Sequence, residues 1–125
     1  MGIIATVDHT RQRVVVRTEG TITLDDVLAH LEEERRDAGL SYSELIDGRG
    51  STPALSSADV RAIVDALSRV AKESRLGPTA ILVDTDLAYG ILRMLEILVE
   101  DVCAVRPFRH REEAEKWLAE VGEGV

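Results

Sequence analysis

Charged residues follow three predicted strands, at the end of the sheet where open α/β folds bind their ligands. They are Asp47, Arg49, Asp84, Asp86, Arg109 and His110. This pattern predicts a polar ligand pocket, or a cation site formed by Asp47, Asp84 and Asp86. In a competing structural interpretation, Asp84 or Asp86 caps a helix, Asp47 holds its own turn, and the arginines neutralise the carboxylates. Because aspartate is so common in such turns, the structural interpretation is favoured.

Two hydroxyl groups, those of Ser56 and Ser57, precede a predicted helix. The free N–H groups and the dipole of a helix N-terminus favour a bound anion or an attached phosphate at this position. A phosphate there would be repelled by Asp59 and partly compensated by Arg61. The ordinary alternative is an N-cap, for which serine is among the preferred residues.

The residues that commonly hold metals or perform catalysis show no recognisable spacing. His9, His30 and His110 fall on a turn, a charged helix and a helix start, and none is spaced for metal ligation with another or with Cys103. The Gly-x-Gly at residues 48–50 lacks the third glycine of a nucleotide-binding loop. No nucleophile stands at a defined spacing from a base. We therefore expect no metal, no cofactor and no enzymatic activity.

Composition excludes several classes of function. The chain has 125 residues, a formal net charge of −8 and only 3% aromatic residues, so electrostatic attraction to nucleic acid or to an anionic membrane is disfavoured. Cys103, the single cysteine, lies in an apolar run and is expected to be a buried, inert thiol. We find no signal peptide and no apolar stretch long enough to span a membrane, so we expect a cytoplasmic protein without membrane insertion.

The elements that must position these residues centre on 79–105. A buried strand at 79–83, a helix at 87–100 and a strand at 102–105 predict a right-handed βαβ unit. Apolar residues cover more than half the circumference of the 87–100 helix, whereas one sheet face needs a stripe of about 100°. The surplus must be covered by a neighbouring helix, a second subunit or an apolar ligand. The predicted interface residues are Leu92, Met94, Ile97 and Val99.

Hydrophobic periodicity places the other elements around this unit. Strands are expected at 3–7, 13–18 (ended by Gly20) and 42–47. A helix should start at Thr23 and run through an exposed charged segment at 32–36 to Gly39. A flexible turn at 48–53, a second helix from Ser56 or Ser57 to Gly77-Pro78 and a last helix from near His110 should follow. The result is an α/β domain of order ββαβαβαβα over residues 1–121. Its mixed five-stranded sheet has an antiparallel first strand at or near an edge, and a disordered tail follows at 122–125.

Four segments together resemble the SpoIIAA-like, or STAS-like, domains. They are residues 19–23 before a helix, 45–50 after a strand, 80–84 in a central strand, and 105–109 followed by the Ala-x-x-Trp-Leu helix of 114–118. The resemblance implies a β-α superhelix of the kind found in small bacterial proteins related to anti-sigma-factor antagonists and, in fold, to a class of lipid-binding domains. In those antagonists a serine in an Asp-Ser-(Ser or Ala)-Gly motif is phosphorylated. Residues 51–59 carry hydroxyls but not that motif.

The sequence therefore predicts a non-catalytic regulatory or interaction module that contacts a protein partner and forms a homodimer through the 87–99 helix. Two alternatives remain open. The domain can instead bind a small apolar or lipid-like molecule beneath that helix, or it can act as a phosphorylation switch at Ser56 or Ser57.

Overall fold

The computed structural model describes residues 2–37 and 39–123, in which strands and helices alternate along most of the chain. The elements are β1 (Gly2–Asp8), β2 (Arg13–Ile22), α1 (Leu24–Arg36), β3 (Ser43–Asp47), β4 (Ser51–Pro53), α2 (Ser57–Ala71), β5 (Thr79–Leu82), α3 (Asp86–Val99), β6 (Val105–Phe108) and α4 (Arg111–Glu123).

The sheet is mixed, with the strand order β1-β2-β3-β5-β6 and with β4 beside β2. The β1–β2 hairpin is antiparallel, and every other pair is parallel. The expected α/β fold with an antiparallel first strand at the edge is thereby confirmed. The expected number of five strands is wrong, because the segment predicted as a flexible turn at 48–53 contains the short strand β4.

The strand β2 does not end at Gly20 as predicted. Its first half pairs with β3, and residues from Gly20 onward pair with β4. Gly20 has φ +68°, a left-handed conformation that glycine adopts without steric cost. The glycine thus stands where β2 changes partner instead of terminating it.

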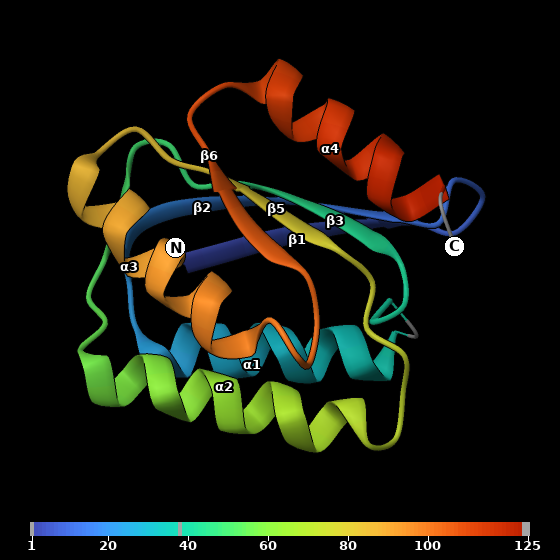
Figure 1. Cartoon of the computed structure of the whole chain (residues 1–125), viewed down its shortest axis with the longest axis horizontal. Helices are drawn as coiled ribbons and strands as arrows, with labels where there is room; N and C mark the ends of the chain where they lie inside the picture. Colours follow the sequence, from blue (N-terminus) through green and yellow to red (C-terminus); the bar gives the residue numbers. More distant parts are fainter. Residues whose placement is uncertain (1, 38, 124–125) are drawn as a thin grey trace.

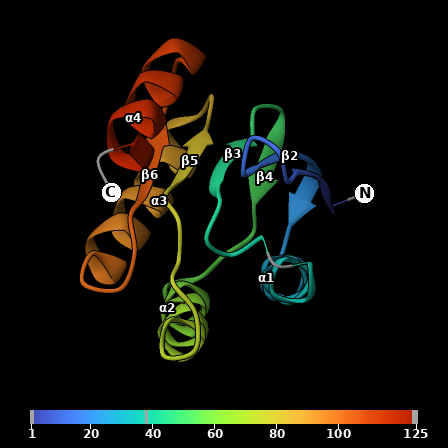
Figure 2. The same ribbon diagram turned by 90° about the vertical axis from the view of Figure 1, so that its right-hand side faces the viewer.

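Two layers of helices enclose the sheet (Figure 1). The helix α4 covers one face, where Leu45, Leu82 and Leu118 form one core cluster. The helices α1, α2 and α3 cover the other face, where Val60, Leu95 and others form a second cluster. Figure 2 looks almost along α1 and α2, which contact one another beneath the sheet.

The last strand begins later than predicted. A turn at residues 100–102 and an irregular segment at 103–104 follow α3, and β6 runs over Val105–Phe108 instead of 102–105. Pro107 lies within this strand. Proline is tolerated there because β6 is an edge strand and has a partner only on the β5 side.

The helix α1 begins as predicted but differs at its end. Thr23 and Asp26 form a reciprocal capping box, which confirms the predicted start. The helix ends at Arg36, three residues before the predicted stop at Gly39. The prediction that the whole charged segment 32–36 is solvated is wrong, because Glu34 is buried.

The helix α2 likewise ends early. It stops at Ala71, and the segment before β5 passes close to the chain at residues 41–42, where Gly77 N–H donates to the carbonyl of Leu40. A Cβ at Gly77 would overlap the backbone of Tyr42, so this approach requires glycine. At the other end of the chain, α4 continues to Glu123, so a disordered tail beginning at residue 122 is wrong. Residues 124–125 of that prediction lie outside the described residues.

The helix α3 only partly bears out the prediction of a wide unpartnered apolar face. Val99 is fully buried in the core, and Leu92 and Met94 are half-buried against the same cluster. Three large apolar side chains remain exposed, namely Leu87, Ile97 and Leu98. No helix in the described part of the chain is long and apolar enough to cross a membrane.

Candidate functional site

An apolar cavity of about 140 Å³ lies between the inner face of the sheet and the helices α1, α2 and α3. Every strand except β6 and all three helices contribute to the cavity or to its margins. The lining residues are Ile3, Thr18, Ile22, Val27, His30, Ile46, Gly48, Ser51, Pro53, Leu55, Ile63, Ile81, Val83, Ala88, Leu92 and Leu95. An apolar cavity of about 150 Å³ is large enough to hold benzene.

The hydroxyl groups in this lining are already hydrogen-bonded. Thr18 Oγ1 and Ser51 Oγ lie 2.7 Å apart and share a hydrogen bond, and both residues are buried. Ser51 Oγ also lies 2.7 Å from the carbonyl oxygen of Gly48, to which it can donate. These hydroxyls tie β2 to β4 and leave the cavity surface largely without free polar atoms.

His30 is the one ionisable residue in the lining, and it belongs to a buried cluster. Its Nε2 lies 2.7 Å from Glu44 Oε2 on β3 and 3.0 Å from Glu34 Oε1, one helical turn along α1. Thr79 Oγ1 on β5 donates to the other Glu44 oxygen at 3.3 Å. The side chains of the histidine and both glutamates are no more than 9% exposed. We call these three residues the His30 cluster.

The cluster changes the proton affinity of its members. Burial alone would lower the pKa of His30, but hydrogen bonds and the negative charge of Glu34 and Glu44 outweigh burial and raise it to about 10. Burial raises the pKa of Glu34 to about 7, although the hydrogen bond from His30 opposes the shift. At neutral pH the imidazole is therefore protonated, and Glu34 is close to its titration midpoint.

We tested whether the His30 cluster fits a metal ion, because it alone among the described residues gathers three ligand atoms within 4.8 Å of one another. A histidine that binds a metal normally donates its other ring N–H to an acceptor. His30 Nδ1 has no such acceptor among the residues that the structure describes. Its Nε2 lies at hydrogen-bond distance from both carboxylates, and the raised pKa means that a proton competes strongly for this nitrogen. The geometry suits a shared proton better than a metal.

The sequence did not reveal this cluster. His30 was judged a histidine on a charged helix, and neither glutamate was singled out. A helical spacing was nevertheless available, because His30 and Glu34 continue the stripe of Val27 at i+3 and i+7. Glu44 lies two residues before the cavity residue Ile46 on β3, so both side chains are on the inner face of the sheet. The same periodicities that identify core positions thus marked the buried polar ones.

The charged residues at the strand ends lie near one another but form separate contacts. Asp47 forms a two-bond ion pair with Arg49 at 2.8 and 2.9 Å, which lowers the pKa of the aspartate. Its Oδ1 also accepts from Arg49 N–H, as the turn interpretation predicted. Asp84 accepts from Gly50 N–H at 3.2 Å, and Arg109 pairs with Asp86 at 2.7 Å.

The competing interpretation, a cation site of Asp47, Asp84 and Asp86, is not supported, because among the described residues only the His30 cluster brings three ligand atoms together. The predicted capping of the following helix by an aspartate is wrong. The N-cap of α3 is Thr85, whose hydroxyl accepts from Ala88 N–H. His110 is exposed just before α4.

Ser56 is the N-cap of α2 and forms a capping box with Asp59, so the structural interpretation of this serine is confirmed. Ser57 is the first residue of the helix and is exposed. Cys103, predicted to be buried and inert, is half-buried, and burial raises its pKa to about 11, which keeps the thiol protonated at neutral pH.

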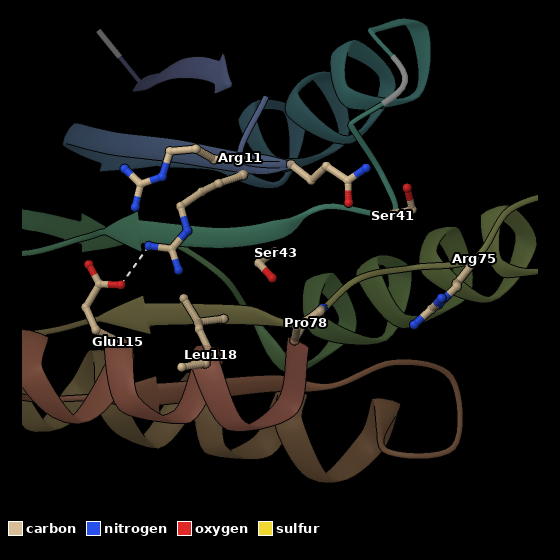
Figure 3. A pocket seen from close by; sticks show the side chains of 10 residues that line it. Arg11, Ser41, Ser43, Arg75, Pro78, Glu115 and Leu118 are labelled. Atoms are coloured by element: carbon tan, nitrogen blue, oxygen red, sulfur yellow. Dashed lines mark hydrogen bonds and ion pairs between the residues drawn. The ribbon is translucent and has the colours of Figure 1, made fainter. Parts of the chain in front are cut away.

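A second hollow is polar and opens on the α4 side of the molecule (Figure 3). This groove has a volume of about 610 Å³ and contains three arginines. Arg13 donates to Glu115 at 2.6 Å, whereas Arg11 and Arg75 have no ion pair with any described residue. Figure 3 shows Arg11 and Arg75 well apart along the groove. The groove suits anionic groups and is chemically unlike the apolar cavity. Sequence reasoning had not singled out these arginines.

Comparison with known proteins adds information on the fold. No protein-family model matches the chain, and no curated protein matches it. Among solved structures, the chain is similar to an uncharacterised DUF3478-family protein with a SpoIIAA-like fold from Shewanella loihica PV-4. The two share 19% sequence identity, with a TM-score of 0.62 and coverage of 94% of each chain. This likeness confirms the SpoIIAA-like fold that the sequence resemblance implied.

Proposed function

We propose that this domain is a non-catalytic binding module that holds a small, largely apolar molecule in the cavity beneath α1, α2 and α3. The observation that carries the proposal is the cavity itself, about 140 Å³ of apolar space at the strand ends where α/β folds commonly bind ligands. Its volume limits the bound part of a ligand to about the size of benzene. A longer molecule would therefore place only one group inside.

The surroundings of the cavity support binding over catalysis. A protonated His30 has no lone pair with which to act as a general base. Thr18 and Ser51 hydrogen-bond to one another, and within residues 2–37 and 39–123 neither hydroxyl is hydrogen-bonded to a base that would activate it as a nucleophile. The lining can therefore bind a ligand through complementary shape and apolar contacts. These are the properties of a site that binds a regulatory or transported molecule.

The test is a titration of the protein with benzene, followed by NMR of its isoleucine, leucine and valine methyl groups. We expect saturable shifts confined to cavity methyls such as those of Ile46, Ile81 and Leu92. The matched control is Ala88→Leu, which places additional carbon atoms in the cavity and should abolish the shifts. A wild-type protein whose methyl spectrum does not respond would refute the proposal.

Self-association through α3 is a second candidate, favoured by its exposed apolar side chains. Leu87 is 61% exposed, Ile97 55% and Leu98 47%. Leu87 and Leu98 are separated by eleven residues, or about three turns, so they share one helix face. Exposed apolar side chains on one face are typical of surfaces that associate.

Sedimentation equilibrium tests this candidate with Ile97→Glu and Leu98→Glu, which change exposed positions and should leave the fold intact. Both variants are expected to convert a dimer into a monomer, while Arg61→Glu, at an exposed position on α2, serves as the control. If the wild-type protein is monomeric at about 100 μM, a dimer with a dissociation constant in the micromolar range is excluded and this candidate is eliminated.

A further inference from the structure

We infer that the ligand of the apolar cavity carries one neutral hydrogen-bond acceptor of the carbonyl type, and that this acceptor binds the N–H group at Nδ1 of His30. The inference rests on the proposed function, because it concerns the occupant of the same cavity. It adds the chemical class of the ligand and names the residue that selects it.

One buried atom of the His30 cluster lacks a hydrogen-bond partner among the described residues. His30 Nδ1 is the one buried side-chain nitrogen or oxygen in the described part of the chain that lacks a hydrogen-bond partner. A buried donor without a partner is costly, so native proteins rarely leave one unsatisfied unless a ligand or water fills the place. The His30 side chain is 91% buried (9% exposed), and His30 is one of the residues that line the cavity.

The surroundings of the imidazole make Nδ1 a hydrogen-bond donor. The Nε2 nitrogen faces two carboxylates, at 2.7 and 3.0 Å, and these acceptors require a proton on Nε2. Because the same carboxylates keep the imidazole protonated at neutral pH, Nδ1 also carries a proton. Nδ1 is therefore a donor. A ligand that offers only a donor, such as an ammonium group, has no partner in this cavity.

The charge around the cavity disfavours an anionic ligand. The His30 cluster contains two carboxyl groups and one imidazole, so it has no surplus of cationic groups for an anionic ligand. The cavity lining contains no lysine or arginine to offset an anionic ligand. Burying a carboxylate or phosphate in this apolar space would therefore lack compensation. A ketone, aldehyde, ester or amide oxygen accepts the hydrogen bond without that cost.

Two probes of nearly the same shape test the inference. Cyclohexanone presents a C=O group, and methylenecyclohexane presents a C=CH₂ group in its place. Each ring is close to the size that a cavity of this volume accepts. We expect cyclohexanone to bind the wild-type protein at least about tenfold more tightly, the usual scale of a hydrogen bond from a charged donor. We also expect the His30 Nδ1–H NMR resonance to shift with cyclohexanone and not with methylenecyclohexane.

The outcomes separate this inference from the proposed function. If neither ring binds, the cavity is not a ligand site and the proposed function fails. If both rings bind with equal affinity and the Nδ1–H resonance does not move, the cavity binds ligands but His30 does not select them. In that case the inference alone is overturned.

A variant without the donor supplies a matched control. His30→Leu combined with Glu34→Met and Glu44→Met, here called the apolar-cluster variant, replaces a buried ionic group by apolar side chains, a change that folded proteins often tolerate. In this variant the preference for cyclohexanone should disappear, and a preference that persists would overturn the inference. The wild-type NMR readout keeps the test decisive if the variant does not fold.

Discussion

Raising the pH from 7 to 9 should weaken the fold through His30. In the folded protein the pKa of His30 is raised from 6.5 to about 10 by its two glutamates. Between these two values the folded protein holds a proton that the unfolded chain has released. The stabilisation is therefore complete below about pH 6.5 and is lost as the pH rises through 10. Glu34, with its pKa raised to about 7, contributes in the same direction but at lower pH, from about 4.5 to 7.

The expected size follows from the proton count. A difference of one bound proton changes the free energy of unfolding by about 1.4 kcal/mol per pH unit. From pH 7 to pH 9 the loss is therefore about 3 kcal/mol. A domain of this size is stable by about 5–15 kcal/mol in total, so the unfolding midpoint should move well outside experimental error.

Urea unfolding at pH 7, 8 and 9 measures this slope directly. The apolar-cluster variant is the control, because it lacks His30 and both glutamates but retains Cys103, whose raised pKa adds its own dependence near the top of the window. The difference in slope between the two proteins isolates the cluster. Equal slopes in the two proteins would refute the assignment of a buried, protonated His30.

Five further substitutions, two of them controls, test the packing and the helix ends. Gly77→Ala should destabilise the protein by about 3 kcal/mol, because a Cβ would overlap the Tyr42 backbone. Gly90→Ala, at an open position in α3, should instead stabilise it by about 1 kcal/mol. Equal effects of the two substitutions on the unfolding temperature would contradict this expectation. Ser56→Ala should cost about 1 kcal/mol through loss of the α2 cap, with Ser57→Ala close to neutral in urea unfolding. Ala88→Leu should raise the unfolding temperature by filling the cavity, with a gain of about 1 kcal/mol; a marked loss would indicate that no usable space exists there.

Features that depend on neighbouring residues could be predicted from the sequence. The starts of α1 and α2 follow from Thr23 with Asp26 and from Ser56 with Asp59, pairs three residues apart whose hydrogen bonds form within one helical turn. The antiparallel hairpin follows from the short connection between its strands. In both cases the chain itself brings the interacting groups together.

Features that depend on distant pairing could not be predicted in the same way. The strand β4 has only three residues, and it forms because β2 extends past Gly20 and offers a parallel partner. The position of β6 was missed because Pro107 argues against a strand unless the strand is known to lie at an edge. Which strands are neighbours, and which strand lies at an edge, is known only once the sheet has formed.

The sequence did not predict the residues of the candidate site for a related reason. The charges at the strand ends attracted attention because they are grouped in the sequence, but Asp47 and Asp86 are each paired with an arginine. Glu34 was assigned to a solvated helix end because four of its neighbours are charged. Only the packing of α1 against β3, which brings Glu44 to His30, reveals that this carboxylate is buried.

The cavity and the His30 cluster are both costly to the fold, and they occur at the same place. An apolar void forfeits the contacts that close packing supplies, and a buried imidazolium shared between two carboxylates is rarely more stable than apolar side chains of similar size. On the opposite face of the sheet, Leu45, Leu82 and Leu118 are packed to 1% exposure or less. The same chain is thus able to form a dense core. Departures from dense packing are expected at functional sites. Here the cavity and the buried ionic cluster coincide around one unsatisfied donor. This coincidence argues for a ligand that fills the cavity and accepts the hydrogen bond.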